Sequence, residues 1–332
     1  MSHELSSLLG AVMRRWKKYT HSASGSWIPV GEADLYLNDY VRHHLKQVSA
    51  YCFPRIFSDG PMYMLFTHLH ALTGKCPYTK EQIVGDIDSW VSGSIHGRPK
   101  KFDSSATKYG LDRIFSDWKH PEPFGFLSFR EYSNDFLRWG TSGGAPKSEI
   151  AGSKYRTKWA WAYANLPVAR KGVDWEKLDL YSAACSAHPQ ATAALKEEPQ
   201  KTREIISTSL PSYLCQCYLL YRWGKPHIPS PAVSATWVAR FETIHANWYG
   251  CLDGDRFDHC VPLNFIMEVV DRLGNADEDC RKVADAEIED LRRLRVEWGH
   301  HSWKWKGGVL SGWRLTSILG TLASLCSAWH IL

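Results

Sequence analysis

Three aspartates lie within six consecutive positions in the stretch CLDGDRFDHCVP, residues 251–262. They are Asp253, Asp255 and Asp258. Leucine, phenylalanine and valine side chains lie among them, which is typical of the edge of a hydrophobic core. Carboxylates this close repel one another and lose hydration when partly buried, so a cation, hydrogen-bond donors or open water must compensate them. The fold must therefore place this segment where such compensation is available.

The composition is that of a folded, reduced protein. The chain has 332 residues, 44% of them hydrophobic, which suffices for one large or two ordinary domains. A net charge of +5 permits nucleic-acid binding without requiring it. Nine cysteines contain no C-x-x-C pair, which argues against a zinc ribbon. No apolar run approaches the ~18 residues of a membrane span, and the basic cluster follows the first apolar residues, unlike a secretory signal. We expect a cytosolic-type compartment and no membrane partner.

Apolar periodicity predicts five helices, three of them in the second half of the chain. They cover residues 32–51, 78–91, 209–224, 262–274 and 277–299. Residues 92–155 are rich in glycine, serine, proline and basic side chains, which predicts loops.

A basic segment, LKEEPQKTREII, covers residues 195–206 and has the pattern K-x-E-x-x-K-x-R. Pro199 disfavours a regular helix there. In an extended chain Lys201 and Arg203 project on one face, an arrangement suited to a triphosphate. An exposed charged turn accounts for the same residues.

A glycine-rich stretch at residues 306–332 precedes an apolar helix. Gly307, Gly308 and Gly312 predict a mobile loop, and Ser311 adds a hydroxyl. A glycine-rich loop before a helix is a common anion-binding arrangement, although a structural loop packed on a core helix fits equally well.

The acidic stretch itself fits a magnesium–phosphate site, because Mg²⁺ takes carboxylate oxygens together with substrate phosphates. The D-x-D pattern also opens haloacid-dehalogenase-type phosphatases. A calcium loop does not fit, because its twelfth position holds Asn264 instead of a glutamate.

The order of these three segments resembles motifs F, A and B of viral RNA-dependent RNA polymerases, most closely those of totivirus-like double-stranded RNA viruses. The resemblance covers residues 195–332. It implies an α+β, helix-rich, right-hand polymerase fold that comprises fingers and a partial palm without a thumb. Residues 1–208 are then fingers and the N-terminal region, and residues 209–332 a partial palm with inserted fingers helices.

The resemblance also implies residue roles. Asp253 holds catalytic Mg²⁺ or Mn²⁺, and Asp258 senses the ribose 2′-hydroxyl. Residues that bind the incoming nucleotide are Lys196, Lys201, Arg203, Ser311, Gly312 and Thr316. RNA template and product, together with nucleoside triphosphates, are the expected ligands. The implied location is the host cytoplasm, within a virion.

Two departures from the family pattern matter. Gly320 occupies the position at which the family has an asparagine that works on the 2′-hydroxyl. No Gly-Asp-Asp tripeptide, the family's motif C, occurs, and the sequence ends at Leu332 within the motif B helix. We therefore expect a fragment or one part of a divided polymerase that is inactive alone, with a second chain carrying motif C or a capsid protein as partner.

Two other classes of function remain open. A non-catalytic remnant that binds RNA accounts for Gly320 and the absent motif C. A phosphotransferase of the haloacid-dehalogenase type would use Asp253 as nucleophile and Asp255 as acid and base, but leaves the other two segments unexplained.

Overall fold

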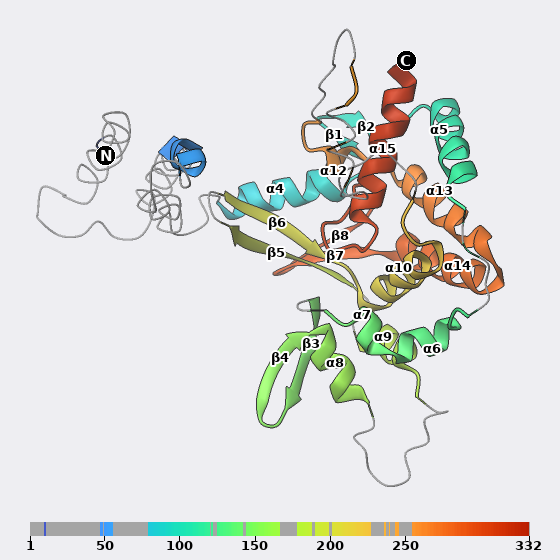
Figure 1. The fold of residues 1–332 in the computed structure, drawn as a ribbon. Helices are drawn as coiled ribbons and strands as arrows, with labels where there is room; N and C mark the ends of the chain where they lie inside the picture. The colour runs from blue at the N-terminus through green and yellow to red at the C-terminus, as the bar shows by residue number, and fades with distance from the viewer. Residues whose placement is uncertain are drawn as a thin grey trace, which may run out of the picture. The chain divides into compact units, whose positions relative to one another are not determined.

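The computed structural model describes residues 10, 47–48, 50–55, 79–119, 121, 125–141, 144–166, 178–187, 190–198, 201–226, 236, 239, 243–245 and 254–331 (Figure 1). The chain forms two compact units. Unit 1 comprises Met1–Gly85 and Ala194–Ile205, and unit 2 comprises Asp86–Ala193 and Ile206–Leu332. The division at residue 208 between fingers and palm stays a prediction.

The predicted helices of the second half are present in unit 2. They are α10 (Leu210–Trp223), α13 (Leu263–Leu273) and α14 (Glu278–Arg293). Helix α10 is buried along nearly its whole length, as its apolar sequence predicts. A 3-10 turn, η4 (Gly274–Ala276), follows α13, and the Asp277 carboxylate then caps α14 by accepting from the Cys280 amide at 2.8 Å.

The predicted extension of α14 to residue 299 is wrong, because the chain becomes β7 (Arg295–Trp298) and pairs in a sheet. Strand β7 lies antiparallel to β8 (His301–Lys304) and parallel to β5 (Ala191–Glu198), and β6 (Lys201–Ser207) completes the order β6-β5-β7-β8. Val296 is fully buried between exposed neighbours, which is the alternation of a strand.

The prediction of loops over residues 92–155 is also wrong. This part contains β1 (Ser94–Ile95), β2 (Arg98–Pro99), α5 (Ser104–Asp117), α6 (Phe129–Asn134), α7 (Phe136–Trp139), β3 (Gly144–Ile150) and β4 (Ser153–Thr157). Two polar residues of this part cap helices instead of forming turns. Asp103 accepts from the Ala106 amide at the start of α5, and Ser128 forms a capping box with Glu131 at the start of α6.

The remaining elements are η1 (Phe53–Arg55), α4 (Lys80–Val91), α8 (Lys158–Asn165), α9 (Leu180–Ala187), α12 (Phe257–Cys260) and α15 (Thr316–Ile331). Helix α15 lies alongside α5 (Figure 1). Large aromatic side chains, among them Trp118, Trp139 and Trp305, are fully buried and fill the core. The expectation of an α+β, helix-rich chain is confirmed.

Candidate functional site

The glycine-rich segment folds as a loop at residues 306–315, between β8 and α15, and is called the glycine loop below. Its first half pairs with the chain that follows the aspartate cluster. The Gly308 amide donates to the Val261 carbonyl at 2.8 Å, and the Val309 amide donates to the Asp258 carbonyl at 2.7 Å. An antiparallel bridge joins Pro262 to Gly307. The fold thus brings together two segments that the sequence separates by about fifty residues.

The second half of the glycine loop pairs with the end of β6. The Ile206 amide donates to Ser311 Oγ at 2.9 Å, and the Gly312 amide donates to the Ile206 carbonyl at 2.8 Å. A Cβ at position 312 would lie 2.7 Å from Ile206 O, so only glycine allows this approach. The Ser311 side chain is exposed, and its hydroxyl accepts one bond there while its own proton can be donated to a ligand.

Thr316 begins α15, and its hydroxyl closes the glycine loop onto the helix. The single proton of its Oγ1 is shared between the carbonyls of Leu310 and Trp313, both at 2.8 Å. The hydroxyl therefore stabilises the loop. The polymerase resemblance assigns the same residue to nucleotide binding.

Thr316→Val should lower the free energy of unfolding by about 1 kcal/mol, because valine keeps the shape and loses both hydrogen bonds. Thr316→Ser keeps the hydroxyl and is the matched control, expected within half that loss. Urea unfolding at pH 7 measures both. Equal losses in the two variants would contradict a hydrogen-bonding role.

Asp258 lies in α12 and is half-buried, and this burial raises the pKa of its carboxyl. A nearby cation would stabilise the charged form of a carboxylate in such surroundings. Asp255 is exposed, and Asp253 lies outside the described residues. Within the part of the chain that the structure describes, no group of three histidine, cysteine or acidic residues could hold a metal ion.

Helix α12 is fixed against α4 by contacts that the sequence did not reveal. The His259 ring stacks on Trp90 with centroids 4.5 Å apart, and the Trp90 indole N–H donates to the Val309 carbonyl at 3.0 Å. Burial lowers the pKa of His259 to about 4, against the opposing effect of Asp86, so this imidazole is neutral at pH 7. Trp90 precedes Val309 by 219 residues, and no local pattern predicts such a contact.

A buried polar network supports the far end of the glycine loop. Gln216 Oε1 accepts from the amides of Arg314 and Leu315 at 2.9 and 3.2 Å. Its Nε2 donates to Glu287 Oε1 at 2.8 Å, and the Ser212 hydroxyl donates to the same oxygen at 2.7 Å. Sequence reasoning missed these residues as well, because a glutamine on an apolar helix carries no signal of its partner.

The predicted triphosphate-binding residues lie on the β5–β6 hairpin. Lys196 is an exposed residue of β5, and Lys201 and Arg203 are residues of β6, so the prediction of an extended backbone is confirmed. All three belong to unit 1, whereas the pairings described above belong to unit 2. In unit 2 the structure joins Asp258, Ser311, Gly312 and Thr316 around one loop.

No family model matches this sequence, and no curated protein matches it. In the described part of the chain, no helix has the length and apolar character needed to cross a membrane.

Proposed function

We propose that this chain supplies the fingers and part of the palm of an RNA-directed RNA polymerase of a totivirus-like double-stranded RNA virus. Its ligands are an RNA template and product, nucleoside triphosphates and Mg²⁺ or Mn²⁺. A second chain that carries motif C, or a capsid protein, is the proposed protein partner, and a virion in the host cytoplasm is the proposed location.

The pairing of the glycine loop with two other segments, which lie far from it in the sequence, carries this proposal. Val309 pairs with Asp258, the last aspartate of the motif A stretch, and Gly308 pairs with Val261 just after it. Ser311 and Gly312 pair with Ile206 at the end of the motif F strand. Motifs that act on one nucleotide must meet in space, whereas unrelated stretches that resemble them by chance need not. The hydrogen bonds of the glycine loop to Asp258, Val261 and Ile206 support the proposal in this respect.

The chemistry assigned to these residues is in-line attack of a 3′-hydroxyl on an α-phosphate, with pyrophosphate as leaving group. Bound metal ions would supply Lewis-acid stabilisation of the attacking and leaving oxygens. Asp253 would hold these ions, and Lys201 and Arg203 would neutralise the triphosphate. The half-buried carboxyl of Asp258, five residues after Asp253, would accept a hydrogen bond from the ribose 2′-hydroxyl.

A non-catalytic RNA-binding protein is the second candidate, and Gly320 favours it. A Cβ at position 320 would lie 4.0 Å from the Phe257 ring of α12, so an asparagine there would reach the segment that carries Asp258. Glycine has no side chain that could act on the 2′-hydroxyl together with Asp258.

Asp253→Ala tests the proposed function through metal binding. The unsubstituted chain with a non-hydrolysable nucleoside triphosphate should bind Mn²⁺, and the variant should bind it at least about ten-fold more weakly, because it loses a carboxylate ligand of the ion. Electron paramagnetic resonance of free Mn²⁺ measures the difference.

Asp255→Ala is the matched control, because Asp255 is exposed and has no role in the proposed site. Its Mn²⁺ affinity should stay within two-fold of the unsubstituted chain. Unchanged binding in Asp253→Ala would favour the non-catalytic protein. Covalent phosphorylation of Asp253 by a small phosphate ester would overturn the polymerase proposal in favour of a phosphotransferase.

A further inference from the structure

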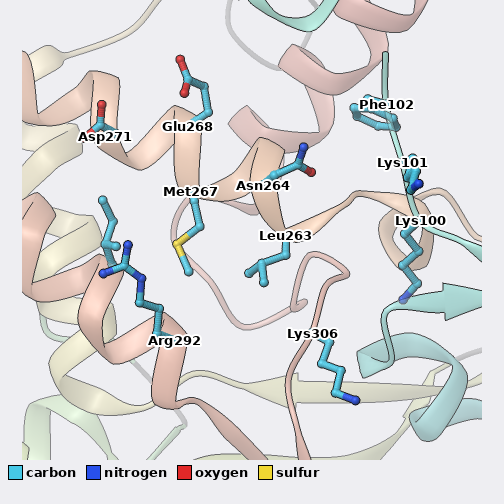
Figure 2. A pocket seen from close by; sticks show the side chains of 11 residues that line it. Lys100, Lys101, Phe102, Leu263, Asn264, Met267, Glu268, Asp271, Arg292 and Lys306 are labelled. Atoms are coloured by element: carbon cyan, nitrogen blue, oxygen red, sulfur yellow. The ribbon is translucent and has the colours of Figure 1, made fainter. Parts of the chain in front are cut away.

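A cavity of about 730 Å³ lies in unit 2, outside the residues that the polymerase resemblance assigns. Its lining comes from α13, α14, residues 100–102 and the first residue of the glycine loop (Figure 2). Figure 2 shows Leu263 and Met267 projecting from α13, with Arg292 of α14 to one side and Lys306 below. This volume is within the range of small-molecule sites, roughly 300–1,000 Å³.

The charge balance of the cavity favours an anion. Its two acids are already paired, Glu268 with Arg272 at 2.7 Å and Asp271 with Arg281 at 3.1 Å. Lys101 and Lys306 are exposed, and neither has an acidic partner among the described residues. Arg292 reaches Glu289 only at 3.7 Å on an exposed helix face, a weak pairing.

Lys100 also lines the cavity, but its amino group is engaged within the fold. It donates to the carbonyls of Trp90 at 2.7 Å and Ser89 at 3.1 Å. The ammonium groups available to a ligand are therefore those of Lys101 and Lys306, with the Arg292 guanidinium as a third cation.

The remaining lining is apolar and fits a base better than a simple anion. Leu263, Met267 and Ile288 provide an aliphatic wall, and Phe102 lies at one side. Asn264 offers both an amide donor and a carbonyl acceptor, as the edge of a base requires. Inorganic phosphate would leave this wall unused, whereas a nucleotide would cover it while its phosphates face the cations.

The cavity adjoins the glycine loop at Lys306, and at Leu263 and Asn264 beside the bridge to Gly307. Lys306 begins the loop, and its amide donates to the Val91 carbonyl at 2.7 Å. Leu263 and Asn264 directly follow Pro262, which bridges Gly307. A ligand that contacts both Lys306 and Leu263 therefore spans the two strands of that bridge and restrains the loop.

We propose that this cavity binds a nucleoside triphosphate without a divalent metal ion, and that binding restrains the glycine loop. The site is separate from the proposed polymerase site, so the proposal does not depend on catalysis.

Isothermal titration of the full chain with ATP in EDTA tests the proposal. EDTA removes divalent metal ions and so suppresses nucleotide binding at the proposed polymerase site. Binding that remains is then assigned to the cavity. The double variant Lys101→Gln and Lys306→Gln should weaken ATP binding at least ten-fold. Lys304→Gln is the matched control, because Lys304 is exposed two residues before Lys306 and does not line the cavity. It should change the affinity less than two-fold.

Three outcomes would overturn the proposal. Loss of ATP binding in Arg203→Ala, with retention in the double variant, would assign the nucleotide to the proposed polymerase site instead. Equal affinity for inorganic pyrophosphate would show that the apolar wall takes no part. Binding of a ten-nucleotide RNA without binding of ATP would make the cavity part of an RNA surface.

Hydrogen exchange tests the effect on the loop. Saturating ATP in EDTA should slow exchange of the Gly308 and Val309 amides at least three-fold, and the double variant should abolish the slowing. Unchanged exchange at saturation would overturn the proposed restraint. Photolabelling with 8-azido-ATP tests the place of binding and should modify peptides that contain Phe102 or Met267. Labelling confined to other peptides would exclude the cavity as the ATP-binding site.

Discussion

Gly308→Ala is expected to lower the free energy of unfolding by on the order of 3 kcal/mol. Gly308 has a φ of +85°, and a Cβ there would lie 2.4 Å from Trp90 O and 2.8 Å from Trp90 Cδ1. Left-handed backbone costs a residue with a Cβ about 1–2 kcal/mol, and overpacking costs about 1–3 kcal/mol.

Trp90 cannot move aside easily to accommodate a methyl group. Only 4% of it is exposed, its indole N–H donates to the Val309 carbonyl, and its ring stacks on His259. Relief of the clash would therefore displace α12 or the loop itself. We expect the exchange rate of the Val309 amide to rise in the variant, because its bond to the Asp258 carbonyl depends on the same approach.

Gly152→Ala is the matched control for this substitution. Gly152 has a φ of +78°, almost that of Gly308, but a Cβ there would meet nothing within 4 Å. It should therefore cost only the backbone strain, about 1 kcal/mol. Urea unfolding of both variants measures the difference. Equal losses would mean that the glycine loop does not pack on Trp90.

Glu287 should make the stability of the protein fall as pH rises from about 4.5 to about 8. Burial raises the pKa of this fully buried carboxyl to about 8, despite hydrogen bonds from Gln216 and Ser212 that oppose the shift. In the unfolded chain its pKa is about 4.3, so across this window the folded state holds a proton that the unfolded state has lost. The folded state is then favoured at the acidic end, by up to about 1.4 kcal/mol per pH unit, and the effect levels off above pH 8.

Glu287→Gln should remove this dependence, because glutamine is neutral at every pH and keeps the oxygen that accepts from Gln216 and Ser212. At pH 8 the variant should be more stable than the unsubstituted protein by on the order of 3 kcal/mol, and at pH 5 the two should differ little. Urea unfolding at four pH values between 5 and 8 measures this.

Glu289→Gln provides the control on the same helix, where Glu289 is partly exposed and paired with Arg293. Its stability should follow the pH dependence of the unsubstituted protein. Burial also raises the pKa of Asp290, but that residue is common to all three proteins and cancels in the comparison. Parallel curves for Glu287→Gln and the unsubstituted protein would contradict a raised pKa at Glu287.

Local sequence signals predicted those elements whose stability is local. Helix α10 follows its apolar run, α13 ends before Gly274 as predicted, and the hairpin strands carry Lys201 and Arg203 in extended chain. The prediction of loops over residues 92–155 is wrong because aspartate and serine favour both turns and helix N-caps. Here Asp103 and Ser128 are the N-caps of α5 and α6.

The candidate site was predicted only in part. Ser311, Gly312, Thr316 and Asp258 were identified from motif spacing, and the structure groups them around one loop. Trp90, Gln216 and Glu287, which hold that loop, were not identified. Each acts through a partner far along the chain, and a single sequence contains no record of such pairs.

The sequence by itself determined the amphipathic helices, the extended basic segment and the glycine loop before the last helix, because each depends on residues a few positions apart. Only the tertiary structure decided that α14 gives way to a strand at Arg295, since Val296 gains a place between Ala191 and Trp303 that no local preference encodes. The same holds for the cavity that Lys306, the first residue of the glycine loop, helps to line. Its lining comes from separate parts of the chain, and chain folding alone brings Lys101, Arg292 and Lys306 to one cavity.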